Sequence, residues 1–481
     1  RVEDTYYMVS TTMHFMPGCE ILQSFDLVHW EHVTYVYETL DHTDAQQLKS
    51  GQNIYGQGMW AASLRYHEGR FYICFVANDT RKTYLYTSEK IDGPWKKQLI
   101  EGFYHDGSLL FDEDGRNYIV YGNDEIWITE LNEDLTAPKK DGLHRLLVSD
   151  HKNPELGYEG SHIQKINGYY YIFLVHSLRD RWMRTEACFY SDSLEGEFTG
   201  GDVLCDDRGY CGQGVAQGGI VDTPDGKWYA MLFQDSGAVG RIPILLPVTW
   251  KDHFPFFGQN GHVPEEIEVH STRPGYIYQP LVGSDDFCNG LLPRWQFNHD
   301  PDPRYYHLDA LQGTYTITTR EVCTELTQAV NTLTQRMSYP SCAAEVTVDA
   351  SALKEGDVAG LCALQSCYAA VGITKHHGKY EVLMLDKKED GILDMTEGTV
   401  VESHQMDFRL EADFCNMKDE ARCYYRVNKG DWLPIGNVHK LYFKLDHFTG
   451  CRFGLFCYAA EETGGSACFR DFKYYDVDEI S

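Results

Sequence analysis

The 481-residue chain lacks long apolar runs: no stretch approaches the about 20 uninterrupted apolar residues that a membrane-spanning helix needs. It is also poor in positive charge, with 42 Lys and Arg against 72 Asp and Glu and a formal net charge of -30. A negative field of this size repels phosphate backbones and anionic lipid headgroups, so nucleic acids and membranes are poor partners. A neutral or cationic small ligand is the better expectation.

The fifteen cysteines form no CxxC pair and no zinc-type spacing. An odd, scattered set in a large chain favours buried, reduced thiols and therefore a reducing compartment. The sequence thus predicts a cytoplasmic protein, and bridges between Cys362 and Cys367 or between Cys205 and Cys211 stay open. No signal peptide is visible at Arg1, and a trimmed N-terminus would leave secreted or periplasmic locations open as well.

Helical periodicity is scarce, whereas short runs rich in Tyr, Val, Ile and Trp recur between Gly and Asp residues, which predicts an all-β protein. A polar turn followed by an aromatic-rich strand occurs five times, and each copy ends in a tyrosine: Tyr7, Tyr72, Tyr118, Tyr171 and Tyr229. An acidic residue or Asn next to Gly forms a tight hairpin turn. Repeats of about 50 residues are typical of four-stranded propeller blades. We therefore predict a five-bladed β-propeller, with a stack of unrelated hairpins as the alternative.

The repeats end near Trp250, and the Thr272-Arg273-Pro274-Gly275 segment is typical of a linker. Short alternating strands such as 343–348 and 468–474 follow it, with turn residues between them. Strands at this spacing predict a two-sheet β-sandwich. The predicted organisation is a propeller domain at 1–271, a linker at 272–283 and a sandwich domain at 284–481.

Two carboxylates precede repeat strands on neighbouring predicted blades. Asp106 lies in Tyr104-His105-Asp106-Gly107-Ser108, and Glu159 lies in Gly157-Tyr158-Glu159-Gly160-Ser161. Since the innermost strands of a propeller line its central channel, we expect both side chains to converge there. Apolar surroundings raise the pKa of a carboxyl group, which suits a general acid near neutral pH. The alternative is a pair of turn-capping carboxylates, because Asp-Gly and Glu-Gly favour turns.

Trp60 occupies the corresponding place before the second repeat, where its ring would stack on a sugar or pack in the core. Arg241 follows the fifth repeat, where its planar set of donors would bind hydroxyl groups or form a salt bridge between blades. Spacing alone leaves both alternatives open.

The Trp60, Asp106 and Glu159 segments, in this order between aromatic hairpins, resemble glycoside hydrolase family 43. Segment 295–303 resembles the C-terminal sandwich of that family's β-xylosidases, a concanavalin A-like jelly roll. The resemblance implies exo-acting, inverting hydrolysis of β-D-xylosides or α-L-arabinofuranosides from plant cell-wall oligosaccharides. It implies Glu159 as the general acid and Asp106 as the carboxylate that orients this acid and raises its pKa. The implied pocket-lining residues are His14, Phe15, Trp60, His105 and Arg241.

The sequence departs from the family pattern in two places. The family's catalytic base is an Asp in an Asp-Pro motif just before the segment that matches 1–7, so we expect the base upstream of residue 1; Asp4 lies in a turn and does not take its place. Many members also hold a hydrated divalent cation with a Gly-His pair, where this chain has Ala216-Gln217. A Gln oxygen can coordinate Ca²⁺, yet the substitution weakens the expectation of a structural Ca²⁺, and the reaction requires no cofactor.

Two other functions compete with hydrolysis. A carbohydrate-binding protein without catalysis would keep Trp60 and Arg241 but lose the acid, and a scaffold propeller would need no carboxylates at matching positions. The presence of Glu159 and Asp106 favours the enzyme, with xylo- or arabino-oligosaccharides as substrates. The sequence leaves open the preferred sugar, the natural polymer and whether the protein forms a homo-oligomer.

Overall fold

The computed structural model describes residues 1–476, which are nearly all β and confirm the predicted fold class. The helical segments in this part of the chain are single 3₁₀ turns: η1 (Lys49–Gly51), η2 (Gly237–Val239), η3 (Leu326–Gln328) and η4 (Cys415–Met417). None of the described helices has the length and apolar character needed to cross a membrane.

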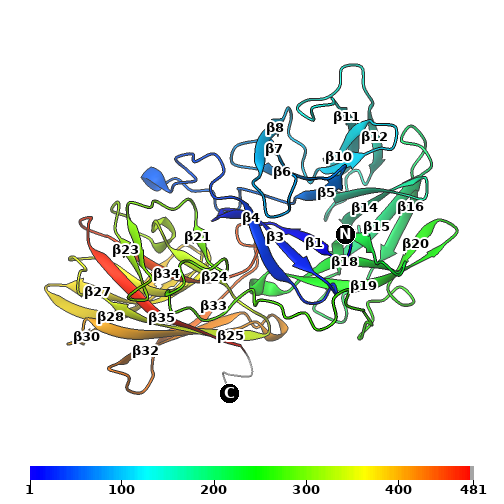
Figure 1. Ribbon diagram of the computed structural model, residues 1–481. Helices are drawn as coiled ribbons and strands as arrows, with labels where there is room; N and C mark the ends of the chain where they lie inside the picture. Colours follow the sequence, from blue (N-terminus) through cyan, green and yellow to red (C-terminus); the bar gives the residue numbers. More distant parts are fainter. Residues whose placement is uncertain (477–481) are drawn as a thin grey trace.

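Five antiparallel sheets follow one another in the first half of the chain and form a five-bladed β-propeller, the right-hand part of Figure 1. Their strands, sheet by sheet, are β1 (Tyr6–Ser10), β3 (Gly18–Ser24) and β4 (Glu31–Tyr37); β5 (Ser63–His67), β6 (Arg70–Ala77), β7 (Lys82–Ser88) and β8 (Lys96–Ile100); β9 (Ser108–Phe111), β10 (Asn117–Asn123), β11 (Glu125–Leu131) and β12 (His144–Ser149); β13 (Glu159–Ile166), β14 (Tyr169–Ser177), β15 (Arg184–Ser191) and β16 (Thr199–Leu204); β17 (Ala216–Asp222), β18 (Trp228–Asp235), β19 (Arg241–Lys251) and β20 (Phe254–Phe257).

The predicted turns join the first and second strands of four blades. At the β5–β6 turn, Glu68 and Gly69 both have positive φ, 46° and 78°, and Asn167 and Gly168 at the β13–β14 turn have 51° and 84°. Two successive residues with positive φ are the mark of a type I′ hairpin, which Asn or an acidic residue followed by Gly tolerates best. The local sequence therefore sets where each blade folds back on itself.

The first sheet differs from the other four because it has three strands within the described residues. In sheets two to five the aromatic repeat forms the second strand, whereas in sheet one it forms β1, which pairs with β3 alone. Consequently β1 itself lines the channel, and residues from Tyr6 to Thr11 reach the cavity described below.

The second half of the chain forms a sandwich of two sheets around one apolar core that includes Trp295, Phe297 and Phe408 (Figure 1, left). One sheet contains β2 (Phe15–Met16), β21 (Gln296–Asn298), β24 (Leu333–Arg336), β34 (Arg452–Tyr458), β26 (Val358–Leu364), β27 (Ala369–His376), β28 (Lys379–Lys387), β29 (Leu393–Met395) and β30 (Thr399–Val401). The other contains β22 (Tyr306–Asp309), β23 (Thr314–Thr318), β35 (Ser466–Asp476), β25 (Ser341–Asp349), β31 (Gln405–Asp413), β32 (Glu420–Val427) and β33 (Leu433–Lys440). The segment between β20 and β21 has no named strand, and the boundaries predicted at 271 and 284 fall inside it.

A short strand from the propeller half fastens the two halves together. β2 pairs with β21, so Phe15 faces Asn298 across the sheet of the sandwich. The guanidinium of Arg452 lies 3.6 Å from the centre of the Phe15 ring, and His14 beside it is fully buried. The expectation that His14 and Phe15 line the sugar pocket is therefore wrong, because this segment leaves its blade to complete the neighbouring sheet.

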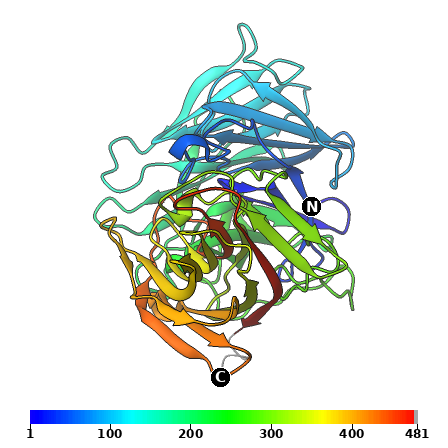
Figure 2. The ribbon, with the colours of Figure 1, turned by 90° about the vertical axis from the view of Figure 1, so that its left-hand side faces the viewer.

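A second junction places a sandwich loop over the propeller. The backbone N–H of Cys451 donates to the carbonyl of Ala238 in η2 at 2.8 Å. A Cβ on Gly240 would lie 2.7 Å from the backbone nitrogen of Gly450, so the two backbones meet only because both residues are glycine. In Figure 2 the sandwich lies in front of the propeller, which agrees with this direct contact. The loop before Cys451 is thereby held at the channel mouth.

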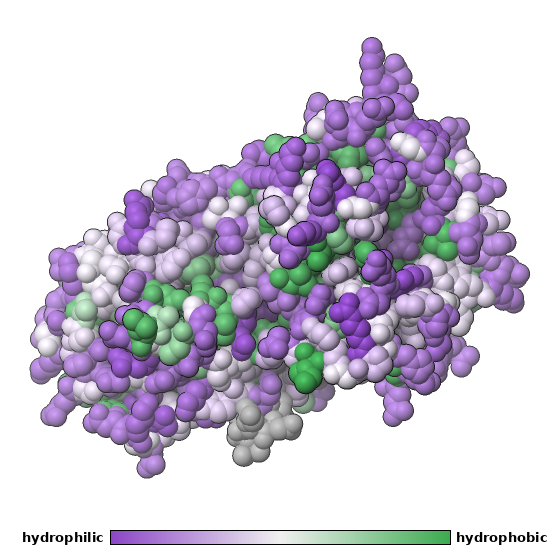
Figure 3. Space-filling view, viewed as in Figure 1, coloured by the Kyte–Doolittle hydropathy of each residue, from purple (hydrophilic) through white to green (hydrophobic). Residues whose placement is uncertain are grey.

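All fifteen cysteines are free, including Cys362, Cys367, Cys205 and Cys211, and most of the fifteen are buried. Burial raises the pKa of such thiols, to about 12 for Cys74, which keeps them protonated and unreactive. Hydrophilic residues cover most of the face of the molecule in Figure 3, and apolar residues form only small separate groups on it. The compartment of the protein stays a prediction.

Candidate active site

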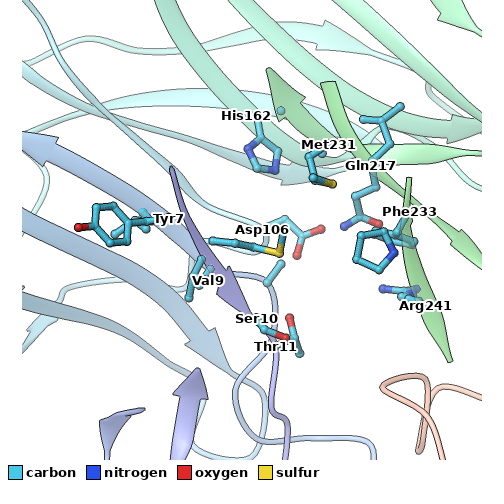
Figure 4. A pocket seen from close by; sticks show the side chains of 18 of the residues that line it. Tyr7, Val9, Ser10, Thr11, Asp106, His162, Gln217, Met231, Phe233 and Arg241 are labelled. Atoms are coloured by element: carbon cyan, nitrogen blue, oxygen red, sulfur yellow. The ribbon is translucent and has the colours of Figure 1, made fainter. Parts of the chain in front are cut away.

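A cavity of about 450 Å³ opens where the propeller channel meets the sandwich. This volume lies within the range of about 300–1,000 Å³ that is typical of small-molecule sites. Residues from the inner strands of the blades and from the sandwich loop 445–449 line it. In Figure 4 the side chains of Asp106, Gln217 and Arg241 point into it.

The two predicted carboxylates meet at this cavity. Asp106 lies in the loop before β9 with a φ of 48°, and its Oδ2 accepts the backbone N–H of Gly160 at 2.9 Å. Glu159 is the first residue of β13, and its Oε2 accepts a hydrogen bond of 2.8 Å from the amide of Asn123 at the end of β10. Asp106 therefore fixes the backbone next to Glu159, which a solvated turn-capping carboxylate would not do.

His105 faces both carboxylates. Its Nε2 lies 3.6 Å from the Oδ2 of Asp106 and 3.6 Å from the Oε2 of Glu159. Burial alone would lower the pKa of His105, but Glu159 and Asp106 outweigh burial and raise it. The site therefore favours a charged His105 between the two carboxyl groups.

The two carboxyl groups respond to this cation in opposite directions. Burial raises the pKa of Asp106, His105 opposes the rise, and the negative charge of Glu159 adds to it. Burial would also raise the pKa of Glu159, but His105 outweighs burial, with help from Arg184 and Arg241, and the pKa is lowered. The expected rise in pKa thus holds for Asp106 and not for Glu159, because the prediction from sequence left out the neighbouring cations.

Arg241 opens the last long strand of the propeller and is held on three sides. Its Nε donates to Asp235 at 3.1 Å, and its guanidinium lies 4.6 Å from the ring centre of Phe233 and 4.3 Å from that of Phe448. Asp235 and Arg241 are register partners in β18 and β19, so this ion pair lies within one blade and not between blades. Among the described residues, the Arg241 guanidinium donates a hydrogen bond through Nε alone. Its terminal N–H groups therefore remain available for a ligand.

Trp60 lines the same cavity, 6.2 Å from the His105 ring and 5.5 Å from the Phe448 ring in an edge-to-face arrangement. Phe448 and Leu445 come from the sandwich, and Leu445 is 66% exposed at the rim. Sequence reasoning missed Phe448, Leu445, Asn123 and Asp235. Only for Asp235 was there a signal, since it directly precedes the turn that leads to Arg241.

The comparisons with known proteins agree with this geometry. The family model for glycosyl hydrolases family 43 matches residues 1–255. The chain belongs to this family. The model for the β-xylosidase C-terminal concanavalin A-like domain matches residues 284–475.

Relatives extend over most of the chain. A β-xylosidase of Formosa agariphila is 26% identical over 539 aligned positions, which cover 99% of this chain and 86% of the relative. A bifunctional GH43-CE structure from Bacteroides eggerthii has 42% identity and a TM-score of 0.91; the match covers 99% of this chain, which spans 62% of the length of that protein. An engineered family 43 enzyme with endo-xylanase and exo-arabinofuranosidase activity has 27% identity and a TM-score of 0.86, covering 99% and 97% of the two chains.

The cation of many family 43 members does not fit the residues present at Gln217. The Oε1 of Gln217 already accepts a 2.6 Å hydrogen bond from the Nη2 of Arg184, and its backbone N–H donates to Glu186. A divalent cation bound to this oxygen would lie next to a guanidinium, which repels it. The grouping of His105, Asp106 and Glu159 brings one ligand-type atom from each within 4.8 Å, but proton transfer explains that spacing without a metal.

The carboxylates that the cavity contains are too close to form an inverting pair by themselves. Asp106 and Glu159 have oxygens within 4.8 Å of each other, whereas an inverting acid and base stand ~6.5–9.5 Å apart to admit a water. They are the two carboxylates among the described residues that line the cavity. The base expected upstream of residue 1 stays a prediction.

Proposed function

We propose that the protein is an exo-acting glycosidase that releases xylose or arabinose from β-D-xylosides and/or α-L-arabinofuranosides with inversion. The observation that supports this most is Glu159, a largely buried carboxyl group at the cavity wall that Asn123 and the Asp106–Gly160 contact hold in place. The names of the relatives supply the two sugars.

The shape of the cavity supports attack at a chain end. A propeller channel alone would present an open face to a polymer, but here the loop with Leu445 and Phe448 stands against Trp60 and Arg241. The loop narrows the opening beside these two residues, which supports cleavage at a chain end over cleavage within a polymer. The neutral substrate also suits a protein with a net charge of -30.

In the proposed reaction Glu159 donates its proton to the leaving glycosidic oxygen. Glu159 and Asp106 raise the pKa of His105, which favours its charged form beside Glu159, and a bound sugar that displaces water from Glu159 raises the pKa of this acid toward the protonated form. Arg241 donates to sugar hydroxyls, Trp60 stacks on the ring, and Asp106 keeps Glu159 in position. The attacking water needs a base on the other face of the sugar.

A second candidate function is sugar binding without turnover. The observation that favours it is the absence of a third carboxylate among the described residues that line the cavity. Binding would then rest on Trp60 and Arg241, and hydrolysis would need a base that these lining residues do not supply.

The test is hydrolysis of an aryl β-D-xyloside and an aryl α-L-arabinofuranoside side by side, with the first-formed anomer followed by proton NMR. We expect inverted product from the chain extended upstream of Arg1, little turnover from residues 1–481, and loss of activity when only the upstream Asp is changed to Asn. Retained product would contradict the mechanism. Equal rates for residues 1–481 and for the extended chain would show that the base lies elsewhere.

A further inference from the structure

A buried arginine lies at the inner end of the candidate site. Arg184 is the first residue of β15, and 3% of its side chain is exposed. Its Nη1 donates to the Oδ2 of Asp235 at 2.9 Å, and its Nη2 donates to the Oε1 of Gln217 at 2.6 Å. Arg184 thus connects two neighbouring blades, since β15 belongs to the fourth sheet and both partners belong to the fifth.

The surroundings of Gln217 are shaped for this contact. Gln217 has a φ of 69°, which costs strain for a residue other than Gly. Its side chain packs so close to Gly160 that a Cβ there would lie 2.8 Å from its Cγ. The buried carboxyl group of Glu186 accepts its backbone N–H at 2.7 Å. The strained backbone therefore presents the amide oxygen to Arg184 at the point where many family members present an imidazole to a cation.

The other contact of Arg184, with Asp235, connects it to Arg241, which faces the cavity. Asp235, 4% of whose side chain is exposed, receives Arg184 on Oδ2 and Arg241 on Oδ1. Both guanidinium groups also lie near one aromatic ring, at 4.8 Å and 4.6 Å from the centre of Phe233. Without Arg184 the carboxylate of Asp235 would keep one partner and gain freedom to turn, and Arg241 would move with it.

We propose that Arg184 takes the place of the channel cation in this protein and positions Arg241 through Asp235. A permanently charged side chain supplies the fixed positive charge, so the site needs no divalent cation at Gln217. Arg184 is a positioning residue, because Asp235 and Gln217 stand between it and the cavity. The part that concerns Arg241 rests on the proposed function, whereas the part that concerns the cation does not.

Calcium binding tests the first part without any activity measurement. The full chain and its Gln217→Ala variant are equilibrated with calcium, passed through a desalting column, and compared for bound calcium by mass spectrometry. We expect equal calcium contents and equal shifts of Tm on adding EDTA. A loss of one calcium per chain in Gln217→Ala would overturn the proposal.

Steady-state kinetics test the second part of the proposal, the positioning of Arg241. They require a chain that has first been shown to hydrolyse an aryl glycoside. Arg184→Met should raise KM about tenfold with a smaller change in kcat, and Arg184→Lys should restore much of the loss. The matched control is Lys165→Met, which removes the cation from another buried aspartate, Asp112, away from the cavity. It should lower Tm by a similar amount and leave KM unchanged. A normal KM in a folded Arg184→Met protein, or an equal rise in Lys165→Met, would overturn the positioning role. An upstream-extended wild-type chain without activity would instead count against the proposed function.

Discussion

The two walls of the cavity have different origins and different chemistry. The propeller wall carries the charged groups, with Asp106, Glu159, His105 and Arg241 at or near the starts of blade strands. The sandwich wall facing them contributes Phe448, which comes from a loop more than 200 residues further along the chain.

The propeller wall therefore supplies the reacting groups, and the sandwich wall controls access to them. Repeated blades bring equivalent strand positions to one channel. Charged residues at equivalent positions of the repeats are therefore predicted to meet there. The sandwich wall instead limits what reaches those groups, through the contact of Gly240 with Gly450 and of Phe448 with Arg241. Changes at Glu159, Asp106 and His105 should therefore affect turnover and its pH dependence, and changes in the sandwich wall should affect binding.

The largest effect is expected from Glu159→Gln in an active, upstream-extended chain. Removing the acid should lower kcat by about 10³-fold on substrates with poor leaving groups, in line with the 10²–10⁴-fold that general acids contribute. The dinitrophenolate of a dinitrophenyl glycoside leaves without protonation, so kcat on this substrate should fall far less. Rates on xylobiose and on the activated substrate measure the two losses. Equal losses on both substrates would refute the assignment of the acid.

Acid should destabilise the protein through three histidines that are buried between its two halves. His14, His299 and His447 are fully buried together between the halves, and burial is the main cause that lowers each pKa, to about 3 for His299 and about 4 for His447. Below their ordinary pKa of about 6.5 the unfolded chain binds protons that the folded chain does not. Stability is therefore full above that pH and falls as the pH drops, by about 1.4 kcal/mol per pH unit for each histidine.

His14→Phe provides the control for this prediction, since neither ring nitrogen of His14 has a hydrogen-bond partner among the described residues and the ring packs 4.2 Å from Phe15. Thermal unfolding between pH 7 and pH 5 should show a smaller loss of Tm in this variant than in the wild type. A parallel loss in the two proteins would place the acid sensitivity elsewhere.

Phe448→Ala tests the sandwich wall. It removes the ring that lies 4.3 Å from Arg241 and edge-on to Trp60, so KM should rise about tenfold, or about 1.4 kcal/mol, while kcat changes little. Leu433→Ala, on an exposed part of the same domain, is the control and should leave KM unchanged. A fall in kcat without a rise in KM would mean that the sandwich takes part in the chemical step.

The smallest effect is a pair of opposite shifts in the alkaline limb of the pH–rate profile. His105→Gln removes the cation that lowers the pKa of Glu159, so the limb should move to higher pH. Asp106→Asn removes a like charge while its side-chain oxygen can still accept the Gly160 N–H, so the limb should move to lower pH. Shifts in the same direction would show that these residues act through structure and not through charge.

The sequence by itself determined the five repeats, the type I′ turns at Glu68-Gly69 and Asn167-Gly168, and the meeting of Asp106 with Glu159. These features are local: a turn depends on two adjacent residues, and a blade depends on strands that follow one another. Repetition then converts a local pattern into a prediction about the channel, because equivalent positions face the same axis. Trp60, which precedes the first strand of its blade, reaches the cavity for this reason.

Only the tertiary structure decided that His14 and Phe15 leave the cavity for the sandwich, that Phe448 enters it, and that Arg184 binds Gln217. Each depends on segments far apart in the chain, and no local pattern records which distant backbone will dock. The direction of the pKa of Glu159 was decided in the same way. Burial and neighbouring charges act in opposite senses on a carboxyl group, and their balance is fixed only when His105, Arg184 and Arg241 are in place around it.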